Sequence, residues 1–95
     1  MIPSHRTPAH PGEILRDEFL EPLGVTQAML ADHIGVAVQH IDEMVRGKRD
    51  ITPETAWLLA QAFDTTPEFW LNLQAANDLV RHRPARAVKR LRRAG

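Results

Sequence analysis

Residues 26–49 read Thr26-Gln-Ala-Met-Leu-Ala-Asp-His-Ile-Gly-Val-Ala-Val-Gln-His-Ile-Asp-Glu-Met-Val-Arg-Gly-Lys-Arg49. Apolar side chains recur at helical spacing on both sides of Gly35: Leu30, Ala31 and Ile34 before it, and Ile41, Met44 and Val45 after it. Thr26 is a favourable N-cap, and glycine turns the chain sharply without strain. The stretch therefore predicts two short helices joined at Gly35, the second running from about residue 36 or 37 to residue 46.

This arrangement is typical of the helix-turn-helix, whose second helix lies in the major groove of DNA. Ala31 is small where the two helices would cross closely. On the second helix the apolar side chains fall on one side, whereas Val38, Gln39, Asp42 and Glu43 fall on the other. We expect these outward residues to lie where base contacts are made.

Signals on both flanks predict three more helices. Proline at a first helical position marks their starts at Pro11, Pro53 and Pro67, the last two after a threonine N-cap. The first helix should end near residues 22–24, and the last should continue to about His82. Pro84 ends that helix or opens a short sixth one. We expect an all-α bundle of five helices, with or without a short sixth: a flexible arm at 1–9, one domain at 10–82 and a basic tail at 83–95.

Composition excludes several classes of protein. The chain has 95 residues and no cysteine, so it holds no disulfide, thiolate metal site or cysteine nucleophile. No apolar run approaches the roughly 18 residues of a membrane helix, and the first residues lack a secretory pattern, so we expect a cytoplasmic protein. His33 and His40 stand outside any catalytic pattern. We expect no enzyme activity, no cofactor and no metal.

The zero net charge conceals an asymmetry. Residues 1–78 hold all 12 acidic side chains and five basic ones, a net charge of −7, whereas residues 79–95 hold seven basic side chains and no acid. Such a tail can contact nucleic acid or an acidic partner, or it can be solvated and merely offset an acidic body. The acidic body weakens the usual electrostatic footprint of a DNA-binding protein.

Gln39 is the best candidate for reading a base, because its amide matches the N6 and N7 edge of adenine. Val38 could pack on a thymine methyl or be partly buried in the core. His40 could reach a phosphate or base edge, or be an ordinary surface histidine. Glu43 could accept from cytosine N4 or be solvated, and Asp42 beside it would repel phosphates.

Phosphate contacts are expected at both ends of the motif. Gln27 lies in the first turn of a helix, where free N–H groups favour an anion. Arg46, Lys48 and Arg49 follow the second helix and would point at the DNA backbone. The alternative is a polar loop without a partner.

The last helix carries more apolar surface than one buried stripe can use, so two copies could pair around a two-fold axis. The expected interface residues are Phe69, Trp70, Leu73, Asn77 and Val80. Alternatively, Phe69 and Leu73 complete the monomer core and Trp70 caps it.

Residues 26–48 resemble the helix-turn-helix of the phage-repressor and Cro-like (XRE) family, with a Thr-Gln-Ala-x-Leu-Ala opening and a closing Gly-Lys. Three segments resemble the HigA antitoxins of bacterial toxin–antitoxin modules: His10-Pro-Gly-Glu-Ile-Leu15, Ile41-Asp-Glu-Met-Val-Arg-Gly-Lys-Arg49 followed by Ile51-Thr52, and Pro67-Glu-Phe-Trp-Leu-Asn-Leu-Gln74. The similarity covers roughly residues 8–82, and it implies a lambda-repressor-like helical bundle.

The resemblance implies a homodimer that represses its own operon and neutralises a HigB toxin, a RelE-like ribonuclease that cleaves messenger RNA. It implies dimer contacts through the last helix, and DNA contacts at Thr26, Gln27, Ala37, Val38, Gln39, His40, Glu43, Lys48 and Arg49. The tail is more arginine-rich than the family pattern.

Two other functions stay open. The chain could be a stand-alone transcriptional regulator of the XRE family with no toxin partner, which the neighbouring gene would reveal. It could also be a helical interaction module that has lost its affinity for DNA, in which case it would show no salt-dependent binding to any duplex.

Overall fold

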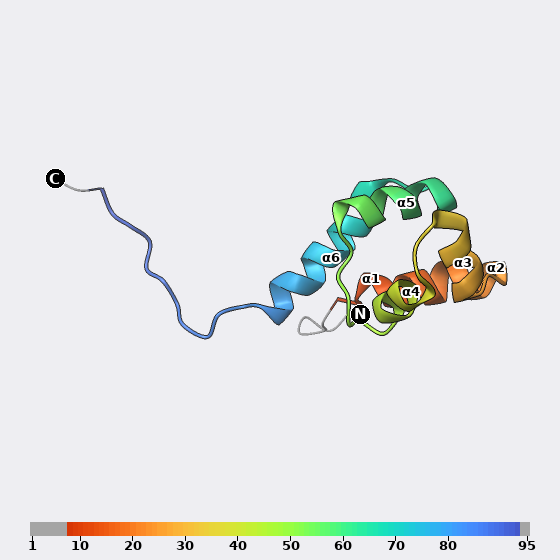
Figure 1. The fold of residues 1–95 in the computed structure, drawn as a ribbon. Coiled ribbons are helices and arrows are strands. Elements are labelled where there is room, and N and C mark those ends of the chain that lie inside the picture. Colours follow the sequence, from red (N-terminus) through yellow and green to blue (C-terminus); the bar gives the residue numbers. More distant parts are fainter. Residues whose placement is uncertain (1–7, 94–95) are drawn as a thin grey trace.

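The computed structural model describes residues 8–93, which form five helical rods and no strand (Figure 1). The first rod is continuous from residue 11 to residue 23 and comprises α1 (Pro11–Ile14), the π-helical η1 (Leu15–Leu20) and α2 (Glu21–Leu23). The others are α3 (Gln27–Ile34), α4 (Val38–Val45), α5 (Pro53–Phe63) and α6 (Pro67–Arg81). The prediction of an all-α bundle of five helices is confirmed.

The alternative of a sixth helix is wrong, because residues 82–93 contain no helix. Basic side chains there stand four apart, as in Arg86 and Arg90 or Lys89 and Arg93, and like charges at that spacing oppose a helix. Val88 and Leu91 remain 77% and 95% exposed, so no packing compensates. Residues 1–7 of the expected N-terminal arm lie outside the described residues.

The helix ends follow from short polar signals. The side chains of Thr26, Thr52 and Thr66 accept hydrogen bonds from the backbone N–H three residues later, which supplies the α3, α5 and α6 N-caps. Gly35 adopts φ 76° after α3, and its N–H donates to the carbonyl of Ala31 at 2.9 Å. The chain therefore reverses between α3 and α4 where the sequence predicted.

The π-helical turns of η1 precede Pro22. In a regular α-helix the ring of Pro22 would meet the carbonyl of Glu18, and its missing N–H would leave that carbonyl unpaired. The N–H of Glu21 instead donates to the carbonyl of Arg16, five residues earlier. The wider turns carry the rod past the proline to Gly24, which ends it at φ 64°.

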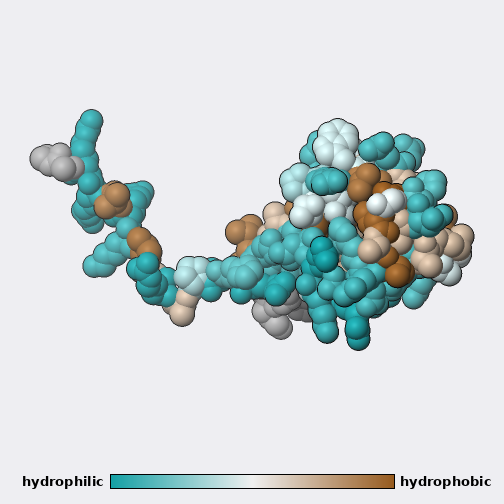
Figure 2. Space-filling model, viewed as in Figure 1, coloured by the Kyte–Doolittle hydropathy of each residue, from teal (hydrophilic) through white to brown (hydrophobic). Residues whose placement is uncertain are grey.

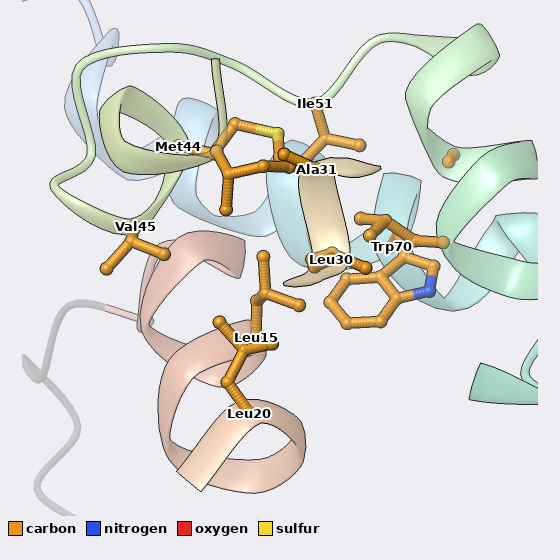
Figure 3. Close-up of a cluster of buried hydrophobic side chains, with 11 residues drawn as sticks. Leu15, Leu20, Leu30, Ala31, Met44, Val45, Ile51 and Trp70 are labelled. Carbon is orange, nitrogen blue, oxygen red and sulfur yellow. The ribbon is translucent and has the colours of Figure 1, made fainter. Parts of the chain in front are cut away.

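The core gathers residues from every rod. Leu15, Ile41, Met44, Leu59 and Trp70 are completely buried. Figure 3 shows Leu15 and Leu20 of the first rod facing side chains of α3, α4 and α6 around one apolar centre. No helix among residues 8–93 has the length and apolar character to span a bilayer.

Gly12 brings the first rod against the end of α4. A Cβ at this position would overlap the carbonyl group of Met44 and lie 3.0 Å from the Cα of Val45. Only glycine allows the two backbones to approach this closely. This contact fixes the first rod beneath the helix that carries the candidate base-reading residues.

Candidate nucleic-acid interface

The two sides of α4 differ as the sequence predicted. Ile41 and Met44 are completely buried and Val45 is 8% exposed. Val38 and Gln39, on the opposite flank near the N-terminus of α4, are exposed. The apolar flank thus anchors α4 in the body while the polar flank faces solvent, a geometry that can enter a groove of DNA.

Val38 is 50% exposed, which contradicts its expected alternative as a partly buried core residue. Ala37 is the N-cap of α4 and makes no side-chain capping bond, so no N-cap side chain occupies the first N–H groups of α4. Ala37, Val38 and Gln39 therefore form one exposed surface with both an amide and a methyl group.

At the start of α3, Thr26 is exposed and its hydroxyl accepts from the N–H of Met29 at 3.1 Å. Gln27 beside it is half-buried. Hydroxyl, amide and backbone N–H groups thus lie together at the positive end of a helix of eight residues. This end is suited to accept a phosphate group.

Two acidic residues of α4 pair with the basic residues that follow it. Arg49 donates to Oε1 of Glu43 from Nε at 3.1 Å and from Nη2 at 2.7 Å. Arg46 lies 3.6 Å from Asp42. The expected repulsion of phosphates by these carboxylates is therefore reduced by neighbouring guanidinium groups, and Lys48 is exposed.

His40 lies on the same helix, α4, and is half-buried. Burial, and then the positive charge of Arg49, lowers the pKa of His40 below its ordinary value, against an opposing effect of Glu43. His40 is consequently neutral at pH 7 and can donate or accept a hydrogen bond, rather than act as a cation toward phosphate.

Gln74 of α6 holds the segment after α4 in place, and the sequence analysis missed it. Its buried side chain accepts from the N–H of Ile51 at 2.8 Å and donates to Asp50 at 3.1 Å and Asp78 at 2.9 Å. The loop that carries Lys48 and Arg49 is thereby tied to α6. The available signal was that Gln74 lies four positions after Trp70, and thus on the same face of an otherwise apolar helix.

The structure corrects two of the predicted dimer contacts. Trp70 is 0% exposed, and its Nε1 donates to the hydroxyl of Thr65 at 2.8 Å. Asn77 is 5% exposed and donates to the carbonyl of Pro8 at 2.9 Å. Both lie with Gln74 on the stripe of α6 that faces the body, so a second copy cannot reach them.

The other three predicted residues lie on the neighbouring stripe of α6. Phe69 is 37% and Val80 47% exposed, and Leu73 is half-buried. Positions 69, 73 and 80 share one helical face. Leu79 beside them is 76% exposed. Three of the five predicted residues therefore lie on one face of α6, where Phe69 and Val80 are exposed and Leu73 also packs against the core.

His10 caps the first rod, since its Nδ1 accepts from the N–H of Gly12 at 2.9 Å. Burial lowers the pKa of His10, the negative charges of Asp50, Asp78 and Glu13 raise it, and Arg81 lowers it. The net direction is downward from 6.5. His10 is thus a buried, neutral structural residue and not part of the candidate DNA-binding surface.

We expect the folded state to lose stability as the pH falls through 6.5, because the unfolded chain then protonates His10 before the folded chain does. One such group contributes a slope of at most about 1.4 kcal/mol per pH unit. His10→Asn keeps a capping oxygen and does not titrate, so its stability should fall less between pH 7.5 and 5.5. Urea unfolding of both proteins measures this; equal losses would contradict the assignment.

Comparison with known proteins agrees with this geometry. The family model Helix-turn-helix matches residues 17–70. Virulence-associated protein I of Dichelobacter nodosus is 46% identical over 70 residues, which cover 74% of this chain and 65% of that protein, just under two thirds. Antitoxin HigA-1 of Vibrio cholerae serotype O1 is 43% identical over 79 residues, covering 83% of this chain and 74% of its own length.

A solved structure extends the similarity to nearly the whole chain. Antitoxin GraA in complex with its operator aligns with a TM-score of 0.83 and 37% identity, covering 98% of this chain and 100% of GraA. The similarity thus includes the first rod and α6 as well as the helix-turn-helix.

Proposed function

Because this chain belongs to the HigA family of helix-turn-helix antitoxins, we propose that it binds its own operator as a homodimer and represses its operon. We further propose that it neutralises a HigB-type toxin, a RelE-like ribonuclease. The observation that carries the DNA-binding proposal is the position of Gln39, exposed on α4 while Ile41 and Met44 lock the same helix into the core. The proposed activity is binding and not catalysis.

In this proposal α4 enters the major groove with Val38, Gln39, His40 and Glu43 toward the bases. Thr26, Gln27 and Ala37 lie at the helix N-termini beside it, and Arg46, Lys48 and Arg49 follow its C-terminus. Contacts from both ends would fix the register of α4 on the duplex. GraA, which aligns with this chain, has been solved with its operator.

The apolar stripe of α6 supports the homodimer. Phe69 and Val80 are exposed and Leu73 is half-buried on one face of α6, and a second copy could cover this face around a two-fold axis. Two copies of α4 would then read half-sites about 34–36 Å apart, near one helical turn of DNA. The expected operator is a palindrome with that spacing.

The test uses the duplex from upstream of the gene in fluorescence anisotropy. Gln39→Ala should weaken operator binding roughly 5- to 150-fold, the equivalent of about 1–3 kcal/mol for a lost bidentate base contact. Binding to a scrambled duplex should change little. Gln61→Ala is the matched control, since Gln61 is an exposed glutamine on α5 whose amide bonds the carbonyl of Trp57.

A wild-type chain with no preference for the operator over the scrambled duplex would overturn the repressor proposal. The product of the neighbouring gene should form a stable complex with the chain and lose its ribonuclease activity. A chain that binds the operator but forms no such complex is a stand-alone regulator.

A further inference from the structure

The basic tail, defined as residues 82–93, leaves the body at the end of α6 and runs outward as an extended segment (Figure 1). Every residue from 79 to 93 is exposed. Figure 2 shows this segment extending away from the body, with a largely hydrophilic surface and isolated hydrophobic side chains. The tail therefore contributes nothing to the core, and its side chains are free to meet another molecule.

The body has little positive charge to offer. Residues 8–78 hold 12 acidic side chains and four basic ones. Three of the four basic groups are already paired with carboxylates: Arg16 with Asp17, Arg46 with Asp42, and Arg49 with Glu43. Within the part of the chain that the structure describes, Lys48 is the one body cation with no ion pair.

The tail has the opposite character. It carries Arg83, Arg86, Lys89, Arg90, Arg92 and Arg93, and Arg81 stands at its root. Among residues 8–93 none of these seven groups forms an ion pair. Most of the uncompensated positive charge of the molecule therefore lies in this segment.

The root of the tail lies beside the expected phosphate contacts. Gln74 bonds both Asp78 of α6 and Asp50, the residue that follows Arg49. Arg81 stands three residues after Asp78, an advance of about 4.5 Å along the helix. The tail thus starts close to the loop that carries Lys48 and Arg49.

The reach of the tail matches the dimensions of DNA. Its 12 residues span up to about 40 Å when extended, at roughly 3.3–3.6 Å per residue. One helical turn of the duplex is about 34–36 Å. A tail that starts beside the loop after α4 is therefore long enough to reach phosphates up to about one helical turn away along the duplex axis.

We propose that residues 83–93 bind the phosphate backbone of the duplex that flanks each operator half-site, and so provide the salt-sensitive affinity that the acidic body lacks. This inference rests on the proposed function. Arginine suits the role because its planar guanidinium group bonds phosphate in a bidentate manner and stays charged. The contacts are independent of base sequence, whereas α4 supplies the sequence preference.

The test compares three full-length proteins by anisotropy between about 50 and 200 mM salt, a range in which phosphate contacts strongly affect affinity. One is the wild type. The second has all six basic residues of 83–93 changed to Gln, and the third has the five arginines among them changed to Lys. Each is measured on the upstream duplex and on a scrambled duplex of equal length. Because the tail makes no core contact, all three should melt alike.

The Gln variant should bind both duplexes at least about tenfold more weakly at the lower salt, and its plot of log K against log salt should be flatter. Each lost phosphate contact flattens the slope by about 0.9. The Lys variant keeps the charge and should keep the wild-type slope. If the slope of log K against log salt is unchanged in the Gln variant, the proposal is overturned. If, in addition, that variant dimerises or binds the toxin more weakly, the tail contacts a protein partner instead. Loss of operator preference in the wild type would instead overturn the proposed function, while the scrambled duplex still reports on the tail.

Discussion

Gly12→Ala should destabilise the protein by about 3 kcal/mol or more, at the upper end of the cost of overpacking. The added methyl group would overlap the carbonyl group of Met44, and a backbone group cannot rotate away as a side chain does. Relief requires the first rod to move off α4, which opens the core around Leu15. For a domain of this size we expect the melting temperature to fall by roughly 12–24 °C.

Gly24→Ala is the matched control. Gly24 has φ 64°, and a Cβ there would meet no heavy atom within 4 Å, so the substitution costs only left-handed backbone strain of about 1–2 kcal/mol. Thermal melting followed by circular dichroism should rank the wild type, Gly24→Ala and Gly12→Ala in decreasing order of stability. If Gly12→Ala melted at or above Gly24→Ala, the close approach of α1 and α4 would be wrong.

Trp70→Ala should cost about 3–5 kcal/mol of folding stability, the usual range for deleting a buried aromatic side chain. The ring lies with its centroid 5.0 Å from that of Phe69 and 5.1 Å from that of Phe19. Its loss leaves a cavity and also leaves the hydroxyl of Thr65 without its donor. Urea unfolding measures the change, and Trp70→Phe should recover part of it.

Val80→Ala provides the contrast on the same helix. Val80 is 47% exposed, so its truncation should change monomer unfolding by no more than about 0.5 kcal/mol. It should nevertheless weaken the proposed dimer in sedimentation experiments. A Trp70→Ala protein that stays folded and only dissociates would restore Trp70 to the dimer interface and contradict the core assignment.

The sequence predicted the helices well because their ends are encoded locally. Thr26, Thr52 and Thr66 cap helices through bonds that span three residues, and Gly35 ends α3 by its own backbone conformation. The exposed flank of α4 followed from helical periodicity alone. The exposed residues of α4 could therefore be identified from the sequence alone, although their contacts with DNA stay predictions.

Features that depend on distant parts of the chain could not be predicted. Apolar residues occur almost all around α6, so periodicity did not show which stripe faces the body. The buried stripe includes Gln74, which bonds Ile51 and Asp50, 23 and 24 positions earlier in the chain. It also includes Asn77, which bonds Pro8, 69 positions earlier. The need for glycine at position 12 likewise arises only from its contact with Met44, which lies in a different helix, 32 positions later in the chain.

The contact between Glu43 and Arg49 gives the molecule an internal competitor for phosphate. If Arg49 contacts phosphate as proposed, an arriving duplex must draw its guanidinium group away from the Glu43 carboxylate, at a cost of about 0–1 kcal/mol for a pair this exposed. In the proposed complex, Glu43 would then be an unpaired negative charge beside the major groove, best tolerated where an amino group of a base replaces Arg49. Phosphate binding and base reading would thus be coupled through these two side chains, and a duplex in the wrong register would leave Glu43 without a partner.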